Sequence, residues 1–424
     1  MEFKKYNHLK EEKKISDFWI KKGCFKPKKG KTKKTFSIVI PPPNVTGRLH
    51  MGHALNNSLQ DVLVRFNRMK GLETLWQPGT DHAGIATQAV VEKNLQKKGV
   101  NKIDLGREKF IEEVWKWKEE SGGIILDQLK KLGCSCDWSR TRFTMDSDLS
   151  KAVLKVFVSL YKNKLIYKDK KLVNWDTKLQ TAISDLEVVQ KEVQSQLYYI
   201  NYSIQNSDQK ITIATTRPET MMGDTAVAVN PKDQRYINLI GKDVIIPIVN
   251  RRVKIIADHY ADPEQGSGAV KITPAHDFND YEVGKRNKLG IINIFEKDGK
   301  INNNGTKEFI GLDRFEARKI LVKKLKESGN LVKIDNIKNK VPYGDRSNTI
   351  IEPLLTEQWF VNAKKLSKKS VKIVHDKKTS FFPNNWTKIY FQWMKNIEPW
   401  CISRQIWWGH RIPAWYDDKK NIFV

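Results

Sequence analysis

Cysteine is scarce in this chain, and its scarcity narrows the classes of protein that the chain can belong to. Among 424 residues the cysteines are Cys24, Cys134, Cys136 and Cys401. They provide neither a disulfide framework nor the paired spacing of a zinc knuckle. Cys134 and Cys136 form a lone C-x-C, which we interpret as packed structure, with a metal site as the weaker alternative. So few thiols suit a reducing compartment, and we expect a cytoplasmic protein.

Long apolar runs are also missing. No stretch approaches the roughly 20 apolar residues that a membrane-spanning helix needs, so we expect no membrane partner. The N-terminal segment contains Glu2, Glu11, Glu12 and Asp17 among its lysines and lacks an apolar core segment. That composition argues against a secretory signal and against a transit peptide. No internal repeat is visible.

Acidic residues are few compared with basic ones. Lysine and arginine number 76 against 48 acidic residues, which gives a formal net charge of +28. An excess of this size favours a polyanionic partner such as nucleic acid. A genome that favours lysine at solvent-exposed positions explains the excess equally well, because the lysines are spread along the whole chain. The length predicts roughly three domains.

Residues 36–53 are the chemically richest segment. The β-branched apolar run Phe36 to Ile40 predicts a buried strand. Three prolines then stop strand pairing and hold the backbone extended. Asn44 to Gly47 reads as a turn, and an amphipathic pattern over Ala54 to Lys70 predicts a helix.

His50 and His53 lie where this turn becomes the helix. A helix N-terminus binds phosphate through its free N–H groups and its partial positive charge. Two imidazoles three residues apart can face the same side of the first turn and donate hydrogen bonds to a transferring phosphoryl group. A metal site or two surface histidines are the alternatives, and the surrounding strand, prolines and turn favour the phosphate site.

Strand-like and helical runs alternate from residue 35 to about 174. This βαβα order predicts an α/β fold with a doubly wound parallel sheet. The predicted strands are Phe36 to Ile40 and Glu73 to Gln77. The predicted helices are Ile15 to Lys22, Ala54 to Lys70, Ile85 to Lys98, Arg107 to Leu132 and Leu149 to Lys164.

The pattern changes near Asp185 to short β-branched runs bounded by turns, which predicts a β-rich domain with a few helices such as Phe315 to Lys326. The predicted strands are Leu197 to Ile204, Lys210 to Thr215, Thr225 to Asn230, Val244 to Ile248, Val253 to Ala257 and Ala269 to Thr273. Around Ile350 we expect a return to helical, Trp-rich sequence. We therefore predict a basic extension over 1–34, the first part of an α/β domain over 35–190, an inserted β domain over 191–345 and the return of the α/β domain over 346–424.

Polar residues follow the second predicted strand, in Pro78 to Gly84. Open α/β sheets bind ligands at the carboxyl ends of their strands. Asp81 could therefore pair with a substrate ammonium group. The alternative, which we favour for this segment taken singly, is that Asp81 caps the helix that begins at Ile85.

Two polar segments stand at strand ends in the β domain, Thr215 to Thr220 and Lys271 to Asp280. Asp277 and Asp280 are three residues apart and could share one helical face. Turn and capping chemistry explains either segment alone, but the two together indicate a second small-molecule site. Lys365 to Ser370 imitates a phosphate-binding Lys-x-Ser-Lys loop, which we interpret as accidental in a lysine-rich chain.

Together these segments resemble the class I aminoacyl-tRNA synthetases, and among them the bacterial valyl-tRNA synthetases. The resemblance covers nearly the whole chain. It rests on Pro41 to Gly47, His50 to His53, Gly79 to Gly84, Thr215 to Thr220, Lys271 to Asp280 and Trp400 to Pro413. Isoleucyl relatives carry a different proline turn and Gly-Trp-Asp in place of Gly79-Thr80-Asp81, so an isoleucyl-type enzyme is the less favoured alternative.

The resemblance implies a Rossmann-like catalytic domain that joins valine to tRNA(Val). Valine attacks the α-phosphate of ATP, which is bound as its Mg²⁺ complex, and the acyl group then moves to the terminal adenosine of the tRNA. The ATP-binding residues implied are His50, Gly52 and His53, and the two histidines are the catalytic residues. The amino-acid-binding residues implied are Pro41, Pro42, Asn44, Asp81 and Trp408, with Asp81 as partner of the α-ammonium group.

The inserted β domain resembles the editing domain that hydrolyses threonyl-tRNA. An apolar pocket cannot strongly reject threonine, which is nearly isosteric with valine, a limit for which valyl-tRNA synthetases are the standard example. The editing residues implied are Thr216, Arg217, Lys271, Thr273, Asp277 and Asp280, with Asp277 as the expected partner of the α-ammonium group. Relatives have an aromatic residue before a Gly-x-Gly where this chain has Gln265, so we expect weaker stacking there.

Two features of the family have no match in this sequence. Where some relatives bind zinc through Cys-x-x-Cys pairs, this chain has Trp175 to Lys178 and Tyr343 to Arg346, so no zinc or other metal site is expected. The second ATP loop, Lys-Met-Ser-Lys-Ser, and the anticodon-binding bundle have no counterpart before Val424. We therefore expect a fragment or one half of a split enzyme, the latter with a separate C-terminal half as partner. The alternatives are a stand-alone editing hydrolase or tRNA-binding module without ligase activity, and a non-catalytic remnant.

Overall fold

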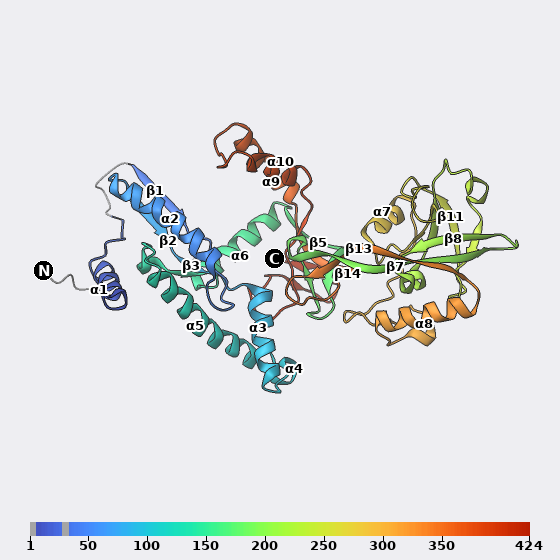
Figure 1. Cartoon of the computed structure of the whole chain (residues 1–424), viewed down its shortest axis with the longest axis horizontal. Coiled ribbons are helices and arrows are strands. Elements are labelled where there is room, and N and C mark those ends of the chain that lie inside the picture. Colours follow the sequence, from blue (N-terminus) through green and yellow to red (C-terminus); the bar gives the residue numbers. More distant parts are fainter. Residues whose placement is uncertain (1–5, 28–33) are drawn as a thin grey trace. The chain divides into compact units, whose positions relative to one another are not determined.

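The structure is a computed structural model that describes residues 6–27 and 34–424. Part of the predicted basic extension therefore lies outside the described residues. The chain divides into two compact units, one formed by residues 1–162 and 406–424 and the other by residues 163–405 (Figure 1). These boundaries differ from those predicted for the four segments, whose domain assignments remain predictions.

The first unit contains the predicted βαβ arrangement. Strand β1 (Thr35–Val39) pairs in parallel with β2 (Glu73–Gln77), and helix α2 (Met51–Met69) connects them. Two shorter strands, β3 (Gly79–Thr80) and β4 (Arg142–Phe143), form a second parallel pair. The carboxyl ends of these paired strands lie next to each other, because the strands run in the same direction. The predicted α/β class with parallel strands is confirmed.

Helices make up most of the rest of the first unit. They are α1 (His8–Lys21), α3 (Gly84–Lys97), α4 (Lys102–Leu105), α5 (Arg107–Lys131) and α6 (Ser147–Lys162), with a short hairpin of β16 (Trp415–Tyr416) and β17 (Ile422–Phe423). Helix α1 begins well before the predicted start, because Asn7 accepts a hydrogen bond from the Lys10 N–H and caps it.

The core of the first unit consists of two hydrophobic clusters. One contains Ile40, Val64, Trp76, Ile125, Leu129, Cys134 and Cys136. The other contains Val45, Val91, Leu95, Phe110, Val114, Phe143 and Trp408. Burial raises the pKa of Cys134 to about 12, so its thiol is neutral near pH 7. The C-x-C pair is therefore part of the packed core, as the sequence indicates.

A four-stranded sheet begins the second unit, in the order β15-β14-β5-β6. Its strands are β5 (Ile166–Asp176), β6 (Thr181–Ile183), β14 (Glu352–Val361) and β15 (Trp400–Cys401). The predicted return to helical sequence at Ile350 is wrong at its start, since β14 pairs along its whole length with β5 and buries Trp359, Phe360 and Val361. Helices α9 (Ala363–His375) and α10 (Trp386–Lys395) follow, so Lys365 to Ser370 is helical and forms no loop.

The predicted β domain is a seven-stranded sheet in the order β12-β9-β11-β10-β7-β13, with β8 paired to β7. Its strands are β7 (Val188–Ile204), β8 (Lys210–Thr215), β9 (Ala226–Val229), β10 (Asp243–Ile245), β11 (Arg252–Ala257), β12 (Ala269–Ile272) and β13 (Leu331–Gly344). Strands β7 and β13 extend together as a long antiparallel ribbon (Figure 1). The β-rich insertion is confirmed.

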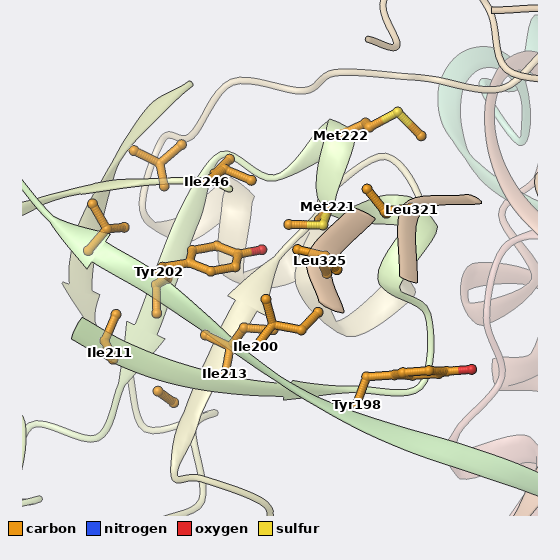
Figure 2. Packing of buried hydrophobic residues seen from close by; sticks show 14 of the residues in the cluster. Tyr198, Ile200, Tyr202, Ile211, Ile213, Met221, Met222, Ile246, Leu321 and Leu325 are labelled. Atoms are coloured by element: carbon orange, nitrogen blue, oxygen red, sulfur yellow. The ribbon is translucent and has the colours of Figure 1, made fainter. Parts of the chain in front are cut away.

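Helices α7 (Phe278–Arg286) and α8 (Arg314–Glu327) and the 3₁₀ helix η3 (Pro218–Gly223) pack with this sheet. Figure 2 shows Ile200 and Tyr202 of β7, Ile213 of β8, Met221 of η3 and Leu325 of α8 gathered in one buried cluster. No helix among residues 6–27 and 34–424 has the length and apolar character needed to cross a membrane.

Candidate functional site

Helix α2 begins with the two predicted histidines. Nδ1 of His50, the N-cap residue, accepts a hydrogen bond from the Gly52 N–H at 3.1 Å, and Nδ1 of His53 accepts one from the His50 N–H at 3.3 Å. Because each Nδ1 is an acceptor, each neutral ring carries its proton on Nε2. Burial and the neighbouring His50 lower the pKa of His53. The two rings, 4.0 Å apart between centroids, therefore present N–H donors beside a helix N-terminus.

The glycine between these histidines leaves room for the His50 ring. A Cβ atom at Gly52 would lie 3.0 Å from the His50 ring, tighter than ordinary contacts. His50, Gly52 and His53 thus form one compact group, as the sequence predicts, and its chemistry suits a phosphate.

The amino-acid site predicted from the sequence is centred on Asp81, which directly follows β3. The Asp81 N–H donates to the Pro43 carbonyl at 2.9 Å, and the Val45 N–H donates to the Asp81 carbonyl at 3.1 Å. This backbone pairing brings Asn44 beside Asp81. Pro41 and Pro42 immediately precede the paired residues and are exposed.

The carboxylate of Asp81 is held through one oxygen. Oδ1 accepts from the Ala83 N–H at 2.9 Å and from the Thr144 hydroxyl at 3.3 Å, and it lies 3.3 Å from His82 Nδ1. Burial alone would raise the pKa of Asp81, but the neighbouring His82 and the hydrogen bond from the Ala83 N–H outweigh burial, and the pKa lies below its ordinary value. Among the described residues no hydrogen-bond partner reaches Oδ2. The alternative that Asp81 caps the following helix is wrong. Helix α3 begins at Gly84, its N-cap is Ala83, and it has no side-chain cap bond.

Trp408 lies next to His82, the residue after Asp81, although it is far away in the sequence. Its indole N–H donates to the His82 carbonyl at 2.8 Å, and its ring packs edge-on against Trp115 with 5.1 Å between centroids. The amide oxygen of Gln88 accepts from the Trp407 and Trp408 N–H groups, which fixes the backbone there. Trp408 is 1% exposed and belongs to the hydrophobic cluster that contains Val45 and Phe143, so it anchors the segment that follows Asp81 to the core.

The second unit contains a buried polar cluster around Lys271. Its ammonium group donates to the hydroxyls of Thr220 and Thr273, at 2.6 Å each, and pairs with Asp224 at 3.2 Å. The Thr273 hydroxyl donates to the same carboxylate at 2.6 Å, and the Tyr202 hydroxyl donates to its other oxygen at 2.7 Å. Burial raises the pKa of Asp224 despite the lysine beside it.

Asp277 and Asp280 belong to the start of α7 but have different environments. Asp277 is the exposed N-cap, and its Oδ1 accepts from the N–H groups of Asn279 and Asp280. Asp280 is buried and accepts from the Thr273 N–H at 2.8 Å, which joins it to the Lys271 cluster. Burial first, and then the charge of Asp277, raise the pKa of Asp280 to about 7.

Arg217 is part of an ion-pair network. It contacts Glu219 at 3.2 Å and Glu352 at 2.5 Å, while Arg318 forms two bonds to Glu219 and Arg314 pairs with Glu352. Thr216 and Arg217, together with His276 and Asp277, line a cleft of about 530 Å³. Lys271, Thr273 and Asp280 are not in its lining, so the predicted editing residues form two neighbouring groups joined through Thr220, whose hydroxyl donates to the Arg217 carbonyl.

Sequence reasoning missed several residues of these sites. Asp224 had a weak signal, because it is an acidic residue between the apolar pairs Met221-Met222 and Ala226-Val227, where a buried carboxylate needs a partner. Tyr202 and Thr144 had none, since each reaches its partner only through the fold. Among residues 6–27 and 34–424 no group of three or more His, Cys, Asp or Glu side chains is placed to hold a metal ion. The expectation that no zinc binds remains a prediction.

Comparison with known proteins agrees with this arrangement. The model of the family "tRNA synthetases class I (I, L, M and V)" matches residues 14–424, and the chain belongs to this family. It is 70% identical over 420 residues to a valine–tRNA ligase of Pelagibacter ubique (strain HTCC1062), covering 99% of this chain and 48% of that protein. It is 56% identical over 447 residues to a valine–tRNA ligase of Mesorhizobium japonicum, again covering 99% of this chain and 48% of the relative.

A solved structure was also found to be similar. The ternary complex titled "Agrobacterium radiobacter K84 agnB2 LeuRS-tRNA-LeuAMS" aligns with a TM-score of 0.40 and 19% identity, over 82% of this chain and 49% of that one. The chain spans about half the length of the curated relatives it matches. The resemblance to class I aminoacyl-tRNA synthetases is confirmed, and both curated relatives named above are valine–tRNA ligases.

Proposed function

We propose that this chain carries part of the amino-acid activation site and the editing site of a valine–tRNA ligase. The observation that carries the proposal is the Asp81 carboxylate, which is ionised and open at Oδ2, in a segment whose His82 carbonyl accepts from the buried Trp408. An ionised carboxylate with a free oxygen fits the ammonium group of an α-amino acid. The substrates proposed are valine, ATP with Mg²⁺ and tRNA(Val), in the cytoplasm.

In the proposed activation step the ammonium group of valine pairs with Asp81. The side chain of valine lies against Trp408, Pro41 and Pro42, and Asn44 is the polar neighbour. The carboxylate of valine attacks the α-phosphorus of ATP, and pyrophosphate leaves. The Nε2–H groups of His50 and His53 donate to the phosphoryl oxygens as negative charge develops on them. The acyl group is then transferred to the 3′-terminal adenosine of the tRNA.

The proposed editing step uses the Lys271 cluster to recognise threonine. The three ammonium protons of Lys271 already have partners in Thr220, Thr273 and Asp224. The hydroxyl of a threonyl group would therefore bond to this cluster by replacing one of these contacts. Valine has no hydroxyl and cannot replace any of them. Asp277 and Asp280 are the carboxylates available to the α-ammonium group, and Asp280 becomes fully ionised only above about pH 7. A water molecule is the proposed nucleophile.

Helix α2 supports the proposal that a further polypeptide completes the activation site. Its outer face exposes a continuous series of large apolar side chains, namely Met51, Leu55, Leu59, Val62, Leu63, Phe66 and Met69, each more than half exposed. A face of this kind marks an interaction surface. We propose that a segment equivalent to the remaining half of the relatives covers it, either in the same polypeptide or as a separate C-terminal half.

A stand-alone editing hydrolase is the second candidate function. It is favoured by one observation, that the Lys271 cluster and the cleft beside it lie entirely within residues 163–405. Hydrolysis of threonyl-tRNA(Val) without any valine binding by the same chain would support this candidate.

Calorimetric titration of the 424-residue chain with valine tests the main proposal. Wild type should bind valine, and Asp81→Asn should weaken binding by at least about tenfold, because one charge-assisted contact is lost. Asp127→Asn, at an exposed carboxylate of α5, is the matched control and should bind as wild type does. Equal binding by wild type and Asp81→Asn would refute the role proposed for Asp81.

A further inference from the structure

Thr144 lies beside Asp81 because of the pairing of two short strands. It directly follows β4, and its N–H donates to the Thr80 carbonyl of β3 at 3.2 Å. Thr144 and Asp81 thus leave the carboxyl ends of adjacent parallel strands. Neither the family match nor the sequence motifs give Thr144 a role.

The Thr144 hydroxyl contacts His82 twice and Asp81 once. It accepts from the His82 N–H at 2.8 Å, lies 2.6 Å from His82 Nδ1 and lies 3.3 Å from Asp81 Oδ1. A hydroxyl has a single proton to donate. If the Thr144 hydroxyl donated this proton to His82 Nδ1, it could not also donate to Asp81, and Asp81 would lose a hydrogen-bond donor. An ionised carboxylate accepts only, so the arrangement that satisfies all three groups has His82 Nδ1–H donating to Thr144 and Thr144 donating to Asp81.

The backbone carbonyl of Thr144 fixes a second imidazole. Nε2 of His410 lies 3.1 Å from this oxygen, and a carbonyl only accepts, so His410 carries a proton on Nε2. The rings of His82 and His410 meet edge to face with 5.1 Å between their centroids. One residue therefore determines the tautomers of two histidines at the edge of the amino-acid site.

This arrangement leaves two acceptors free. With Nδ1 protonated, Nε2 of neutral His82 has a lone pair, and among the described residues neither this atom nor Asp81 Oδ2 has a hydrogen-bond partner. Gly409 lies next to His82 with φ 136°, and a Cβ atom there would come within 3.7 Å of Nε2. A glycine at this position keeps the space beside the acceptor open.

We propose that Thr144 is a positioning residue, whose hydroxyl orients Asp81 and His82 so that Asp81 Oδ2 stays free to accept a hydrogen bond from a primary ammonium group. This inference rests on the proposed function for the identity of the ligand. It adds Thr144 as the group that holds the Asp81 carboxylate and sets the tautomer of His82. His410 supports the segment that carries Thr144, because its Nε2–H donates to the Thr144 carbonyl.

Nitrogen-15 NMR of histidine-labelled 424-residue protein tests the tautomers directly, because protonated and unprotonated ring nitrogens have well-separated shifts. His82→Gln and His410→Gln proteins assign the two signals. Wild type should show His82 protonated at Nδ1 and His410 at Nε2. In Thr144→Val, which keeps the carbonyl, His82 should become a tautomer mixture while His410 stays unchanged, and Thr144→Ser should restore the wild-type pattern. Thr141→Val is the control, since the Thr141 hydroxyl donates to the Trp138 carbonyl, away from both histidines.

Valine titrations of the same proteins test the consequence for binding. Thr144→Val should weaken valine binding by about tenfold, whereas Thr144→Ser and Thr141→Val should bind as wild type does. A wild-type His82 protonated at Nε2 overturns the inference even if Thr144→Val does not fold. An unchanged His82 tautomer in folded Thr144→Val also overturns it. If wild type shows the expected tautomers but binds neither valine nor another primary ammonium compound, the proposed function and the ligand assignment fail, and the tautomer network stands.

Discussion

The Lys271 ammonium group lies 3.2 Å from the Asp224 carboxylate, and both side chains are buried within the second unit. The same carboxylate receives the hydroxyls of Thr273 and Tyr202, so Asp224 is the centre of the cluster that we propose for editing. Figure 2 shows Tyr202 inside the hydrophobic core. Its hydroxyl donates to Asp224 from there. The cluster is therefore built into the core.

Replacing Asp224 should damage both stability and editing. Asp224→Asn leaves Lys271 buried without its counter-charge, and breaking such a pair costs about 3–5 kcal/mol. We expect a lower urea midpoint for the second unit and at least a tenfold slower hydrolysis of threonyl-tRNA(Val). Asp243→Asn is the matched control, because it removes another Lys–Asp contact of the same unit, the pair with Lys254 at 3.0 Å. Lys254 is exposed and Asp243 is only partly buried, so this pair is worth about 1 kcal/mol at most. Equal effects of the two substitutions would contradict the central position of Asp224.

The pKa of Asp280 predicts a pH dependence of stability. In the folded protein this carboxyl stays protonated up to about pH 7, whereas in the unfolded chain it ionises near its ordinary value of 3.8. The folded state therefore binds the extra proton between these values, so this group lowers the free energy of unfolding as pH rises from about 4 to above 7. Wild type should lose stability relative to Asp280→Asn between pH 5 and pH 8 in urea titrations.

Asp277→Asn provides a second check on Asp280. The charge of Asp277 helps to raise the pKa of Asp280, so removing it should move the titration to lower pH. A difference between wild type and Asp280→Asn that does not vary with pH would show that Asp280 is ionised throughout.

Two substitutions can separate the role of His50 as N-cap of helix α2 from its proposed role as a hydrogen-bond donor to the phosphate. Asparagine is a good N-cap residue, so His50→Asn should keep the helix stable while removing the Nε2–H donor. His50→Ala should lose both, at a cost of about 1 kcal/mol. In a reconstituted enzyme we expect both substitutions to slow valine activation by about 10²-fold. If His50→Asn restored the activation rate, His50 would have only the capping role.

The exposed face of α2 should matter for association and not for the fold of this chain. Replacing Leu59 and Phe66 with glutamate should leave thermal unfolding nearly unchanged, because both side chains are more than half exposed. The double substitution should reduce aggregation and abolish binding of a C-terminal half in co-purification. Ile320→Glu on α8, an exposed apolar residue of the other unit, should have no effect on that binding. Undiminished binding by the α2 protein would place the contact elsewhere.

Sequence patterns predicted the elements in which one face is buried. The bounds of β2 and β8 match the predictions because their alternation of buried and exposed residues is clear. The ribbon of β7 and β13 was predicted only in part. From Val188 to Gln196 its side chains are mostly exposed and polar, so no apolar period marks the strand. Strand β14 was mistaken for helix because its burial depends on pairing with β5, nearly 200 residues earlier in the chain.

The candidate sites show the same limit. Motifs identified His50, His53, Asp81 and Lys271, since each stands in a segment with several polar residues at a strand or helix end. Thr144, which bonds to Asp81, and Tyr202, which bonds to the Asp224 partner of Lys271, are single polar side chains that reach their partners through the tertiary fold. Arg217 was identified by its motif, but only the structure shows that Glu219 and Glu352 already engage its guanidinium group.

Valine-dependent exchange of pyrophosphate into ATP tests the proposed function most directly. The 424-residue chain would be measured alone and mixed with the separately produced second half of the Pelagibacter ubique valine–tRNA ligase, to which it is 70% identical over the matched region. We predict little exchange by the chain alone and robust exchange by the mixture with valine but not isoleucine, lost with Asp81→Asn and kept with Asp127→Asn. Robust exchange by the chain alone, or no exchange by a mixture shown to form a complex, would contradict the account.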